Sequence, residues 1–219
     1  MDKGEKTKRK VMDAAVSLFN VRGYSGTSVR AIANEAGVNG ALISYYFGNK
    51  QGLLEQLMID FLENYTNIVE ESYKKLELVS AKSCLYTIVT DLLKYQQKNH
   101  HLARFVHREV TLDSTLVREL MMTYLMKEKH FVKALVEAGM KKKEFRQLSC
   151  DFVVIQLRAL LTMPYSQPQY IREVYHLQPH EEYFVQKYIK HIERWLSEFL
   201  YNDISESEEL KLNKIVSNK

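Results

Sequence analysis

Residues 23–50 read GYSGTSVRAIANEAGVNGALISYYFGNK and contain two short segments on either side of a glycine. The first ends at Gly37, follows Ser28 as its candidate N-cap, and carries apolar residues at helical spacing: Val29, Ile32, Ala33 and Ala36. The second covers residues 39–46, begins at Asn39, which is also a favoured N-cap residue, and is expected to face inward at Ile43. Two short helices joined across a glycine predict a helix-turn-helix, whose second helix enters the DNA major groove.

Longer helices are expected on both sides of this pair. Residues 7–21 place apolar side chains at helical spacing and are followed by Gly23 as a C-terminal stop: Val11, Ala14, Ala15, Leu18 and Phe19. Residues 49–78 carry a longer apolar stripe: Leu53, Leu54, Leu57, Met58, Phe61, Leu62, Tyr65, Ile68 and Val69. A stripe of this length must pack on two regions: the N-terminal helix-turn-helix region, called the head, and the C-terminal remainder of the chain, called the body. This helix is therefore expected to connect two domains.

The remaining chain is predicted to be helical as well, because strand-like alternation is absent. Helices are expected near residues 81–98, 101–110, 114–143, 149–163, 168–176 and 180–201. We therefore expect an all-α protein with a helix-turn-helix domain at 1–48 and a helical regulatory and dimerisation domain at 49–202. The polar, charged segment 203–219 is expected to be a flexible tail.

The charge of the chain is concentrated in the head. Residues 1–50 hold eight Lys or Arg and four acids, and this excess of four accounts for the whole net charge of +4. A basic head on a neutral body suits a protein that binds a polyanion such as DNA. A solvated, lysine-rich terminus would have the same composition, so charge alone leaves both interpretations open.

Other classes of protein find little support in the sequence. No apolar run approaches the length of a membrane span and the start is too polar for a secretory signal, so a cytoplasmic location is expected. DNA binding by the predicted helix-turn-helix would make that location nucleoid-associated. Cys84 and Cys150 are isolated and are expected to be core thiols. His100, His101 and His107 lack an acid or cysteine at ligand spacing, so surface or packing roles are favoured over a metal site. No catalytic or phosphate-loop motif occurs, which argues against an enzyme and against a cofactor.

A family resemblance rests on a series of residues in the head: Gly23-Tyr24, Thr27-Ser28-Val29-Arg30, Ile32-Ala33, Ala36-Gly37-Val38, Tyr45-Tyr46-Phe47, and Lys50 with Leu53-Leu54. In order and without gaps, they resemble the N-terminal domain of the TetR family of bacterial regulators. The resemblance implies a homodimer that binds a palindromic double-stranded DNA motif through its two heads. It also implies a helical body that, in many members, binds a small-molecule effector.

The resemblance also implies which residues contact DNA: Ser28, Arg30, Asn39, Gly40, Ala41, Leu42, Ser44, Tyr45, Tyr46 and Lys50. Lys50 matches the phosphate-binding lysine of the family, whereas Ser44 stands where a tyrosine is usual. Ser28 is as well explained by capping alone, and only one of the adjacent Tyr45 and Tyr46 can pack inward. The smallness of Gly40 and Ala41 suggests close approach to the groove floor, with readout supplemented by DNA shape.

Four segments of the body carry a narrower resemblance: FVHREVTLDSTLVRE (105–119), TYLMKEK (123–129), MPYSQPQYI (163–171) and LQPHEEYF (177–184). They are similar to a TetR-type regulator of the tubulin-like division protein FtsZ in spore-forming bacilli. This resemblance implies that the DNA-bound protein restrains FtsZ assembly in cell division during sporulation. Arg104 and Arg108, four residues apart, then become a candidate partner surface, although a solvated face explains them equally. The alternative is a conventional ligand-responsive transcriptional repressor.

Two further features of the body are interpreted from composition. A Met-rich and aromatic stretch either encloses an effector pocket or forms ordinary core: Met121, Met122, Tyr124, Met126 and Phe131. The last helix has more apolar surface than one-sided packing requires: Tyr183, Phe184, Tyr188, Ile189, Ile192, Trp195, Leu196 and Phe199. That surplus predicts a subunit interface.

Overall fold

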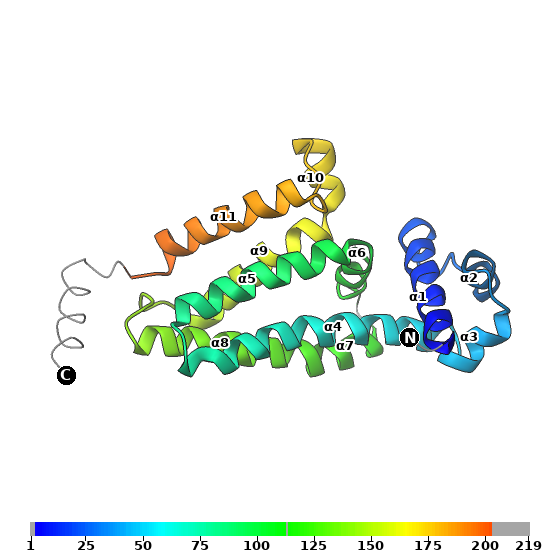
Figure 1. Cartoon of the computed structure of the whole chain (residues 1–219), viewed down its shortest axis with the longest axis horizontal. Coiled ribbons are helices and arrows are strands. Elements are labelled where there is room, and N and C mark those ends of the chain that lie inside the picture. The colour runs from blue at the N-terminus through cyan, green and yellow to red at the C-terminus, as the bar shows by residue number, and fades with distance from the viewer. Residues whose placement is uncertain (1–2, 113, 203–219) are drawn as a thin grey trace.

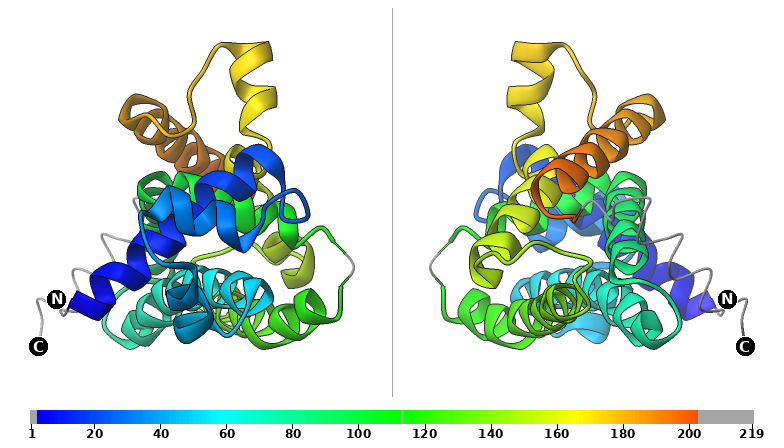
Figure 2. Two further views of the ribbon diagram at one scale, coloured as in Figure 1. Left: turned by 90° about the vertical axis from the view of Figure 1, so that its right-hand side faces the viewer. Right: turned by 90° about the vertical axis from the view of Figure 1, so that its left-hand side faces the viewer.

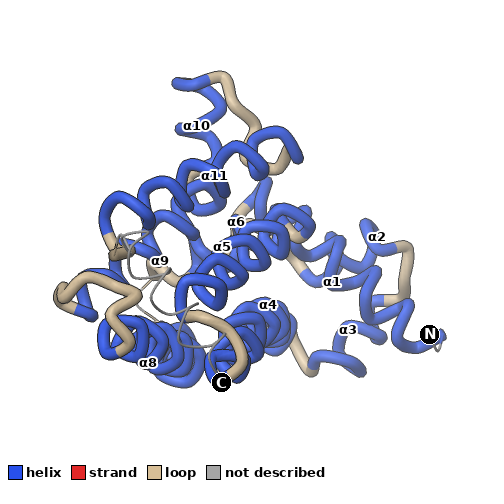
Figure 3. The backbone as a smooth tube through the Cα atoms, turned by 60° about the vertical axis from the view of Figure 1, so that its left-hand side comes forward, coloured by secondary structure: helices blue, strands red, loops and turns tan. Residues whose placement is uncertain are grey.

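The computed structural model describes residues 3–112 and 114–202, and within them the regular structure is helical (Figure 1; Figure 3). A single isolated antiparallel bridge joins Phe145 to Tyr201 within these ranges. The α-helices are α1 (Lys3–Arg22), α2 (Val29–Ala36), α3 (Gly40–Phe47), α4 (Lys50–Lys74), α5 (Ala81–Lys98), α6 (His100–Glu109), α7 (Thr115–Leu120), α8 (Met126–Lys141), α9 (Cys150–Ser166), α10 (Pro168–Tyr175) and α11 (Glu182–Phe199). The expected all-α class is confirmed.

Helices α1, α2 and α3 form a small head at one end of the molecule (Figure 1). Their apolar faces meet in a common core that includes Val11, Phe19, Ile32 and Ile43, each fully buried. Gly23 and Gly37 follow the ends of α1 and α2, as expected, and both have positive φ values, of 74° and 64°. Local sequence signals therefore account for the architecture of the head.

Helix α4 runs from the head along the length of the body (Figure 1). Asn49 caps it, because the Gly52 N–H donates to Asn49 Oδ1 at 2.9 Å. Gly52 is required here, since a Cβ at this position would lie 2.1 Å from the Phe47 carbonyl oxygen. The helix was expected to reach residue 78 but ends at Lys74, and a 3-10 turn, Lys75–Glu77, comes directly after it. It contacts α3 of the head and α5 and α8 of the body.

The body is built around α5, which packs against α4, α8, α9 and α11. Figure 2 views the molecule along its long axis, with α10 standing out from the other helices of the body. Among the described residues, no helix combines the length and apolar character needed to cross a bilayer. The predicted tail at 203–219 lies outside the described residues.

One predicted helix of the body is interrupted. The segment expected to be continuous over 114–143 consists of α7, a π-helical stretch at Met121–Leu125, and α8. A π-helical stretch widens the turn and rotates the residues after it. Met122 and Met126 are exposed, at 67% and 50%, so they fit neither the pocket nor the core interpretation. The other three members of this stretch are partly buried against the core: Met121, Tyr124 and Phe131.

Candidate nucleic-acid interface

Helix α3 presents a small, largely exposed face from its first residues. Asn39 is its N-cap, and the Ala41 N–H donates to Asn39 Oδ1 at 2.9 Å. The carboxamide oxygen of Asn39 is therefore used within the head, and its NH₂ group is the part suited to donate to DNA. Ala41 and Ser44 are exposed, whereas Ile43 is buried, as its spacing predicted.

Gly40 is not required by the interior of the head. A Cβ at this position would meet the Ala33 Cβ at 3.9 Å, an ordinary van der Waals contact. The φ angle of Gly40 is not in the left-handed region, and the position is the first residue of α3. The fold would accept alanine here, so a reason for glycine must be sought outside the head.

Helix α2 offers Ser28 and Arg30 near its start. The Ala31 N–H donates to Ser28 Oγ at 3.1 Å, which confirms that Ser28 caps the helix. Arg30 lies in the first turn with its side chain exposed. The helix N-terminus and the guanidinium are thus both accessible to a phosphate.

Tyr45 and Tyr46, near the end of α3, lie in different surroundings, as expected for adjacent residues on a helix. Tyr45 is 79% exposed, whereas Tyr46 is half-buried and packs on the core of the head. Their rings make an edge-to-face contact with centroids 5.1 Å apart. Leu42 is also half-buried, so only part of its side chain can reach a base.

Lys50 has a role within the head that its sequence position did not reveal. Its Nζ donates to the carbonyl oxygens of Tyr24 and Thr27, at 3.0 and 2.9 Å, and lies 4.3 Å from the centroid of the Tyr24 ring. These bonds hold the turn between α1 and α2 against the start of α4. An ammonium group has three donors, so one remains for the phosphate contact predicted from the family resemblance.

Comparison with known proteins identifies the class of this interface. Residues 11–57 match the profile of the family described as bacterial regulatory proteins, tetR family. The probable HTH-type transcriptional regulator YttP of Bacillus subtilis is 48% identical over 200 residues, which cover 91% of this chain and 97% of YttP. The chain belongs to the TetR family. It is accordingly a DNA-binding transcriptional regulator of TetR type, in a family that is not enzymatic.

Solved structures of this family share the fold. A tetR-family regulatory protein from Rhodococcus RHA1 aligns with a TM-score of 0.70 at 15% identity, covering 89% of this chain and 97% of that one. FadR from Bacillus subtilis, solved in complex with stearoyl-CoA, aligns with a TM-score of 0.65 at 19% identity, covering 83% of this chain and 95% of that one. The TetR-like arrangement of head and helical body is thereby established.

The narrower resemblance to an FtsZ regulator is not supported. YttP, which matches over nearly the whole chain, is described as a probable transcriptional regulator, and that description says nothing of FtsZ. The comparisons give no support to a role in cell division, septum formation or sporulation, or to FtsZ as a partner.

Arg104 and Arg108, the residues of the candidate partner surface, make different contacts in the structure. Arg108 donates from Nη2 to the Phe19 carbonyl oxygen at 3.0 Å, so it links α6 to α1 of the head. It also lies 3.4 Å from Glu109 Oε1. Arg104 instead lines two neighbouring cavities at the body surface. Arg108 is thus partly engaged by the head, whereas Arg104 faces the cavities, and a shared partner surface of the two residues stays a prediction.

Two more contacts join the head to α6. Asn20 Nδ2 donates to the His101 carbonyl oxygen at 2.8 Å, and the Phe19 and Phe105 rings stack with centroids 5.2 Å apart. Together with Arg108, they attach the C-terminal half of α1 to the body. The partners lie more than eighty residues apart in sequence, at separations of 81 and 89 for the two hydrogen bonds, so no local pattern could have predicted them.

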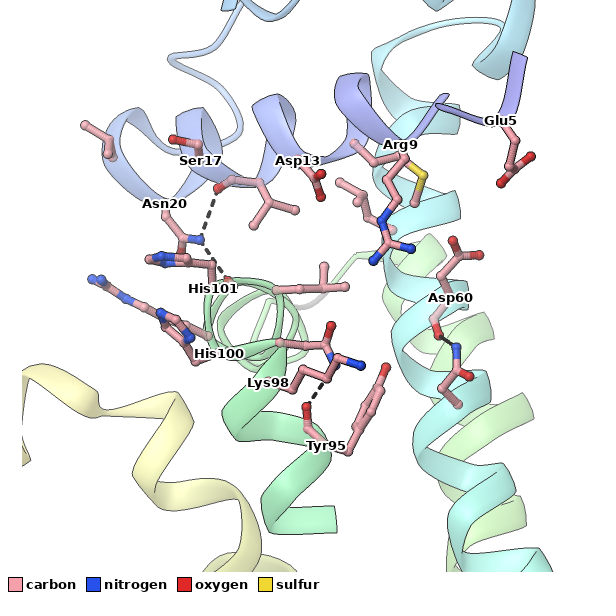
Figure 4. A pocket seen from close by; sticks show the side chains of 18 residues that line it. Glu5, Arg9, Asp13, Ser17, Asn20, Asp60, Tyr95, Lys98, His100 and His101 are labelled. Carbon is pink, nitrogen blue, oxygen red and sulfur yellow. Dashed lines mark hydrogen bonds between the residues drawn. The ribbon is translucent and has the colours of Figure 1, made fainter. Parts of the chain in front are cut away.

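A cavity of about 680 Å³ lies beside this contact, between α1, α4, α5 and α6 (Figure 4). Arg9 and Asp13 line it from the head, and Asp60, Tyr95 and Lys98 line it from the body (Figure 4). Its lining carries both signs of charge. A volume of this order is typical of small-molecule sites.

The interior of the body contains polar groups that the sequence analysis did not single out. Arg158 of α9 donates to the carboxylate of Glu128 on α8. Burial raises the pKa of Glu128, and the Arg158 charge acts in the opposite direction. The buried Tyr65 hydroxyl has no hydrogen-bond partner among the described residues. Burial raises the pKa of Tyr65, the Glu128 charge acts in the same direction, and the Arg158 charge acts in the opposite one. A buried, charged cluster thus lies among α4, α8 and α9.

The three histidines considered as ligands occupy different environments. His107 is buried, and its Nε2–H donates to Gln96 Oε1 at 2.7 Å, the geometry of a packing histidine. Burial, helped by the charge of Arg158, lowers the pKa of His107 to about 3. His100 and His101 lie at the start of α6 near the surface. In the described ranges, no group of three or more His, Cys, Asp or Glu is arranged to hold a metal ion.

The cysteines are unpaired in the structure. Cys84 is buried, as expected, whereas Cys150 is half-buried, with its Sγ 3.7 Å from Met140 Sδ. Burial raises the pKa of both thiols, which disfavours the reactive thiolate.

Proposed function

We propose that this protein is a homodimeric, sequence-specific transcriptional repressor whose affinity for DNA is lowered by a small molecule bound to its body. The observation that carries the proposal is the attachment of α1 to α6 through Arg108, Asn20 and the stacked Phe19 and Phe105. A ligand that shifts α6 would move the head with it, because these contacts act on a short, rigid helix. FadR, solved with stearoyl-CoA, supports the idea that a body of this fold holds a ligand.

For DNA contact we propose the exposed face of α3 with the anchors around it. Gly40, Ala41 and Ser44 approach the bases, and the Asn39 NH₂ group and the exposed part of Leu42 assist them. Phosphate anchors are supplied by residues at the edges of this face: Ser28, Arg30, Tyr45, Tyr46 and Lys50. Because few of these side chains are long, DNA shape supplies much of the specificity.

For the dimer we propose an interface centred on the exposed face of α9. The last helix uses most of its apolar stripe inside the chain, where Phe184, Ile189 and Ile192 are buried. The surplus that remains on it is smaller than its composition suggested. Helix α9 instead exposes Phe152 and Ile155, at 67% and 61%, with Gln156 and Ala159 on the same face.

The dimer interface has a direct test. Ile155→Glu should convert the dimer to a monomer and weaken binding to a two-half-site operator by at least about 100-fold, because one head alone lacks the second half-site. Analytical ultracentrifugation measures the first effect and a gel-shift titration the second. Lys190→Glu, on an exposed position of α11, is the control for an added surface charge. An unchanged sedimentation coefficient for the Ile155 variant would place the interface elsewhere.

The regulatory proposal is tested in two steps on the full chain. Selection from random double-stranded DNA should yield a palindromic motif, and recovery of no preferred sequence would contradict the DNA-binding part. A thermal-shift screen should then find a compound that stabilises the protein saturably and releases that DNA. In Arg108→Gln the compound should still bind but release DNA less completely, whereas Arg194→Gln should behave as the wild type. Equal release from both variants would exclude the α1–α6 link as the route.

A division role is separable by experiment. An FtsZ pelleting assay, with and without the selected DNA, should show no change in polymer mass if the protein acts through transcription. A DNA-dependent loss of FtsZ polymer would instead restore the division hypothesis. The engagement of Arg108 by the head removes one half of the surface that was expected to contact such a partner.

A further inference from the structure

A shallow cavity on the body collects basic side chains from three separate segments. Its volume is about 130 Å³, and it lies next to the larger cavity beside α1. His100, His101 and Arg104 reach it from the start of α6, Arg172 from α10, and His180 from the turn before α11. Among the described residues that line it, none is an aspartate or a glutamate.

The histidines are crowded together. The His100 ring lies 4.0 Å from that of His101 and stacks on that of His180 at 4.8 Å, measured between centroids. His100 Nδ1 donates to the Gln97 carbonyl oxygen at 3.2 Å, which orients the ring. Burial lowers the pKa of His100, and the electrostatic effect of His101 lowers it further. The lowered pKa favours the neutral form of His100 unless a negative charge binds beside it.

Arg104 and Arg172 lack a strong carboxylate partner within the described part of the chain. Arg104 is half-buried, and in residues 3–112 and 114–202 no carboxylate lies within ion-pair distance of it. Burial, and then the charges of Arg108 and Arg172, lowers the pKa of Arg104. Arg172 pairs with Glu173 of its own helix at 2.8 Å, but both side chains are exposed, and such pairs contribute little. A partly desolvated guanidinium surrounded by bases is unfavourable without an anion.

We propose that this groove, defined by Arg104, Arg172, His100, His101 and His180, binds the phosphate group of a small molecule. Two guanidinium groups from different helices can each donate two parallel hydrogen bonds to a phosphate, and the imidazoles add further donors when protonated. A phosphate suits this donor set better than a carboxylate, because it offers more acceptor oxygens and more charge. The small cavity accommodates the phosphate, and the larger cavity that shares His100, His101 and Arg104 gives room for the rest of the molecule.

The groove is placed to influence the head. Arg104 lies one helical turn before Arg108, and the His101 carbonyl accepts the hydrogen bond from Asn20. A phosphate that pulls α6 and α10 together would therefore act on the helix that holds α1. This regulatory consequence rests on the proposed function, whereas the binding site itself does not depend on it.

The full chain is titrated with inorganic phosphate, and binding is measured by isothermal calorimetry and by ³¹P NMR line broadening. Glycerol 3-phosphate, as a simple ester, and acetate, as a carboxylate, are titrated in parallel. We expect saturable binding of phosphate or its ester, one per chain, and a loss of affinity of about tenfold or more in Arg104→Gln. Arg172→Gln should show a smaller loss. The matched control is Arg194→Gln, since Arg194 is an exposed arginine that pairs with a nearby glutamate, Glu198, at 2.8 Å, as Arg172 does with Glu173.

Each outcome decides the proposal. Tighter binding of the ester than of phosphate indicates a phosphorylated metabolite, and the reverse indicates free phosphate; both support the site. Equal affinity in the wild type and the Arg172 variant, equal affinity for acetate, or no saturation overturns it. Arg172 is exposed, so its variant decides the question even if the Arg104 variant fails to fold. DNA binding by the wild type is measured separately, and its persistence would leave the proposed function standing if the phosphate site fails.

Discussion

The head and the body use their polar side chains in different ways. In the head, polar groups act close to their own position in sequence, as when Ser28 and Asn39 cap the helices directly after them. In the body, polar groups meet across distant elements at buried and half-buried positions, as in the pair of Glu128, which is buried, and Arg158, which is half-buried. The head is thus stabilised by local rules around an apolar core, whereas the body depends on long-range polar pairing.

The largest expected effect comes from breaking the buried pair of the body. Glu128→Leu leaves the Arg158 guanidinium without its partner and should destabilise the protein by about 3 kcal/mol in urea unfolding at fixed protein concentration. The double variant Glu128→Leu with Arg158→Leu should recover most of that loss, because two apolar groups then replace two charges. If the single and double variants were equally unstable, the charge pairing would not be what stabilises this region.

The next effect concerns Lys50, the residue of the head that most resembles the body in its long-range contacts. Lys50→Ala removes hydrogen bonds from a charged donor to Tyr24 and Thr27 and should reduce stability by about 2 kcal/mol. If the third donor also contacts DNA, the slope of log affinity against log salt should fall by about one, and weakening should be similar on all sequences.

Lys50→Arg serves as the control, since it keeps the charge but changes the donor geometry. A stability loss with an unchanged salt slope would make Lys50 a structural residue alone. An unchanged stability would contradict the role of the two carbonyl contacts.

The buried histidine gives the body a dependence on pH that the head does not share. The folded-state pKa of His107 is about 3, whereas that of an unfolded histidine is near 6.5, so between these values the unfolded state binds more protons. The contribution of His107 to stability is therefore present above pH 6.5 and is lost as the pH falls toward 3. By pH 5.5 the loss should be about 1.4 kcal/mol relative to pH 7.5.

Urea unfolding of the wild type and of His107→Gln at the two pH values measures this effect. The variant should lack this part of the pH dependence, although its stability at pH 7.5 will also be lower. Parallel pH profiles for the two proteins would show that His107 is not responsible.

The smallest expected change in stability is at Gly40. Gly40→Ala introduces a Cβ that meets Ala33 at an ordinary distance, so the head should be unchanged or more stable by about 0.5 kcal/mol. DNA affinity should nevertheless fall about fivefold, an effect of roughly 1 kcal/mol, if the α3 backbone approaches the groove floor. Thermal unfolding and a gel-shift titration provide the two measurements, and full DNA affinity in the variant would show that close approach is not needed.

Prediction from sequence succeeded where the controlling contacts are local. The bounds of α5 at Ala81–Lys98 and the ends of α2 agree with their periodicity and with their capping and glycine signals. The interruption at Met121–Leu125 was missed, because a π-helical stretch has no distinct sequence signal. For the candidate site, the capping of Ser28 and the inward position of Ile43 were predicted, whereas the carbonyl contacts of Lys50 were not.

The sequence by itself determined that this protein has a helix-turn-helix head with a basic excess and a helical body. Those properties result from periodicity, caps and glycines, which act within a few residues of one another. The tertiary structure alone decided that Arg108 would hold the head, that Arg104 would join Arg172 in a basic groove, and that Glu128 would be buried against Arg158. Each of these depends on which helix faces which, and that choice results from packing the whole core rather than from any segment of the chain.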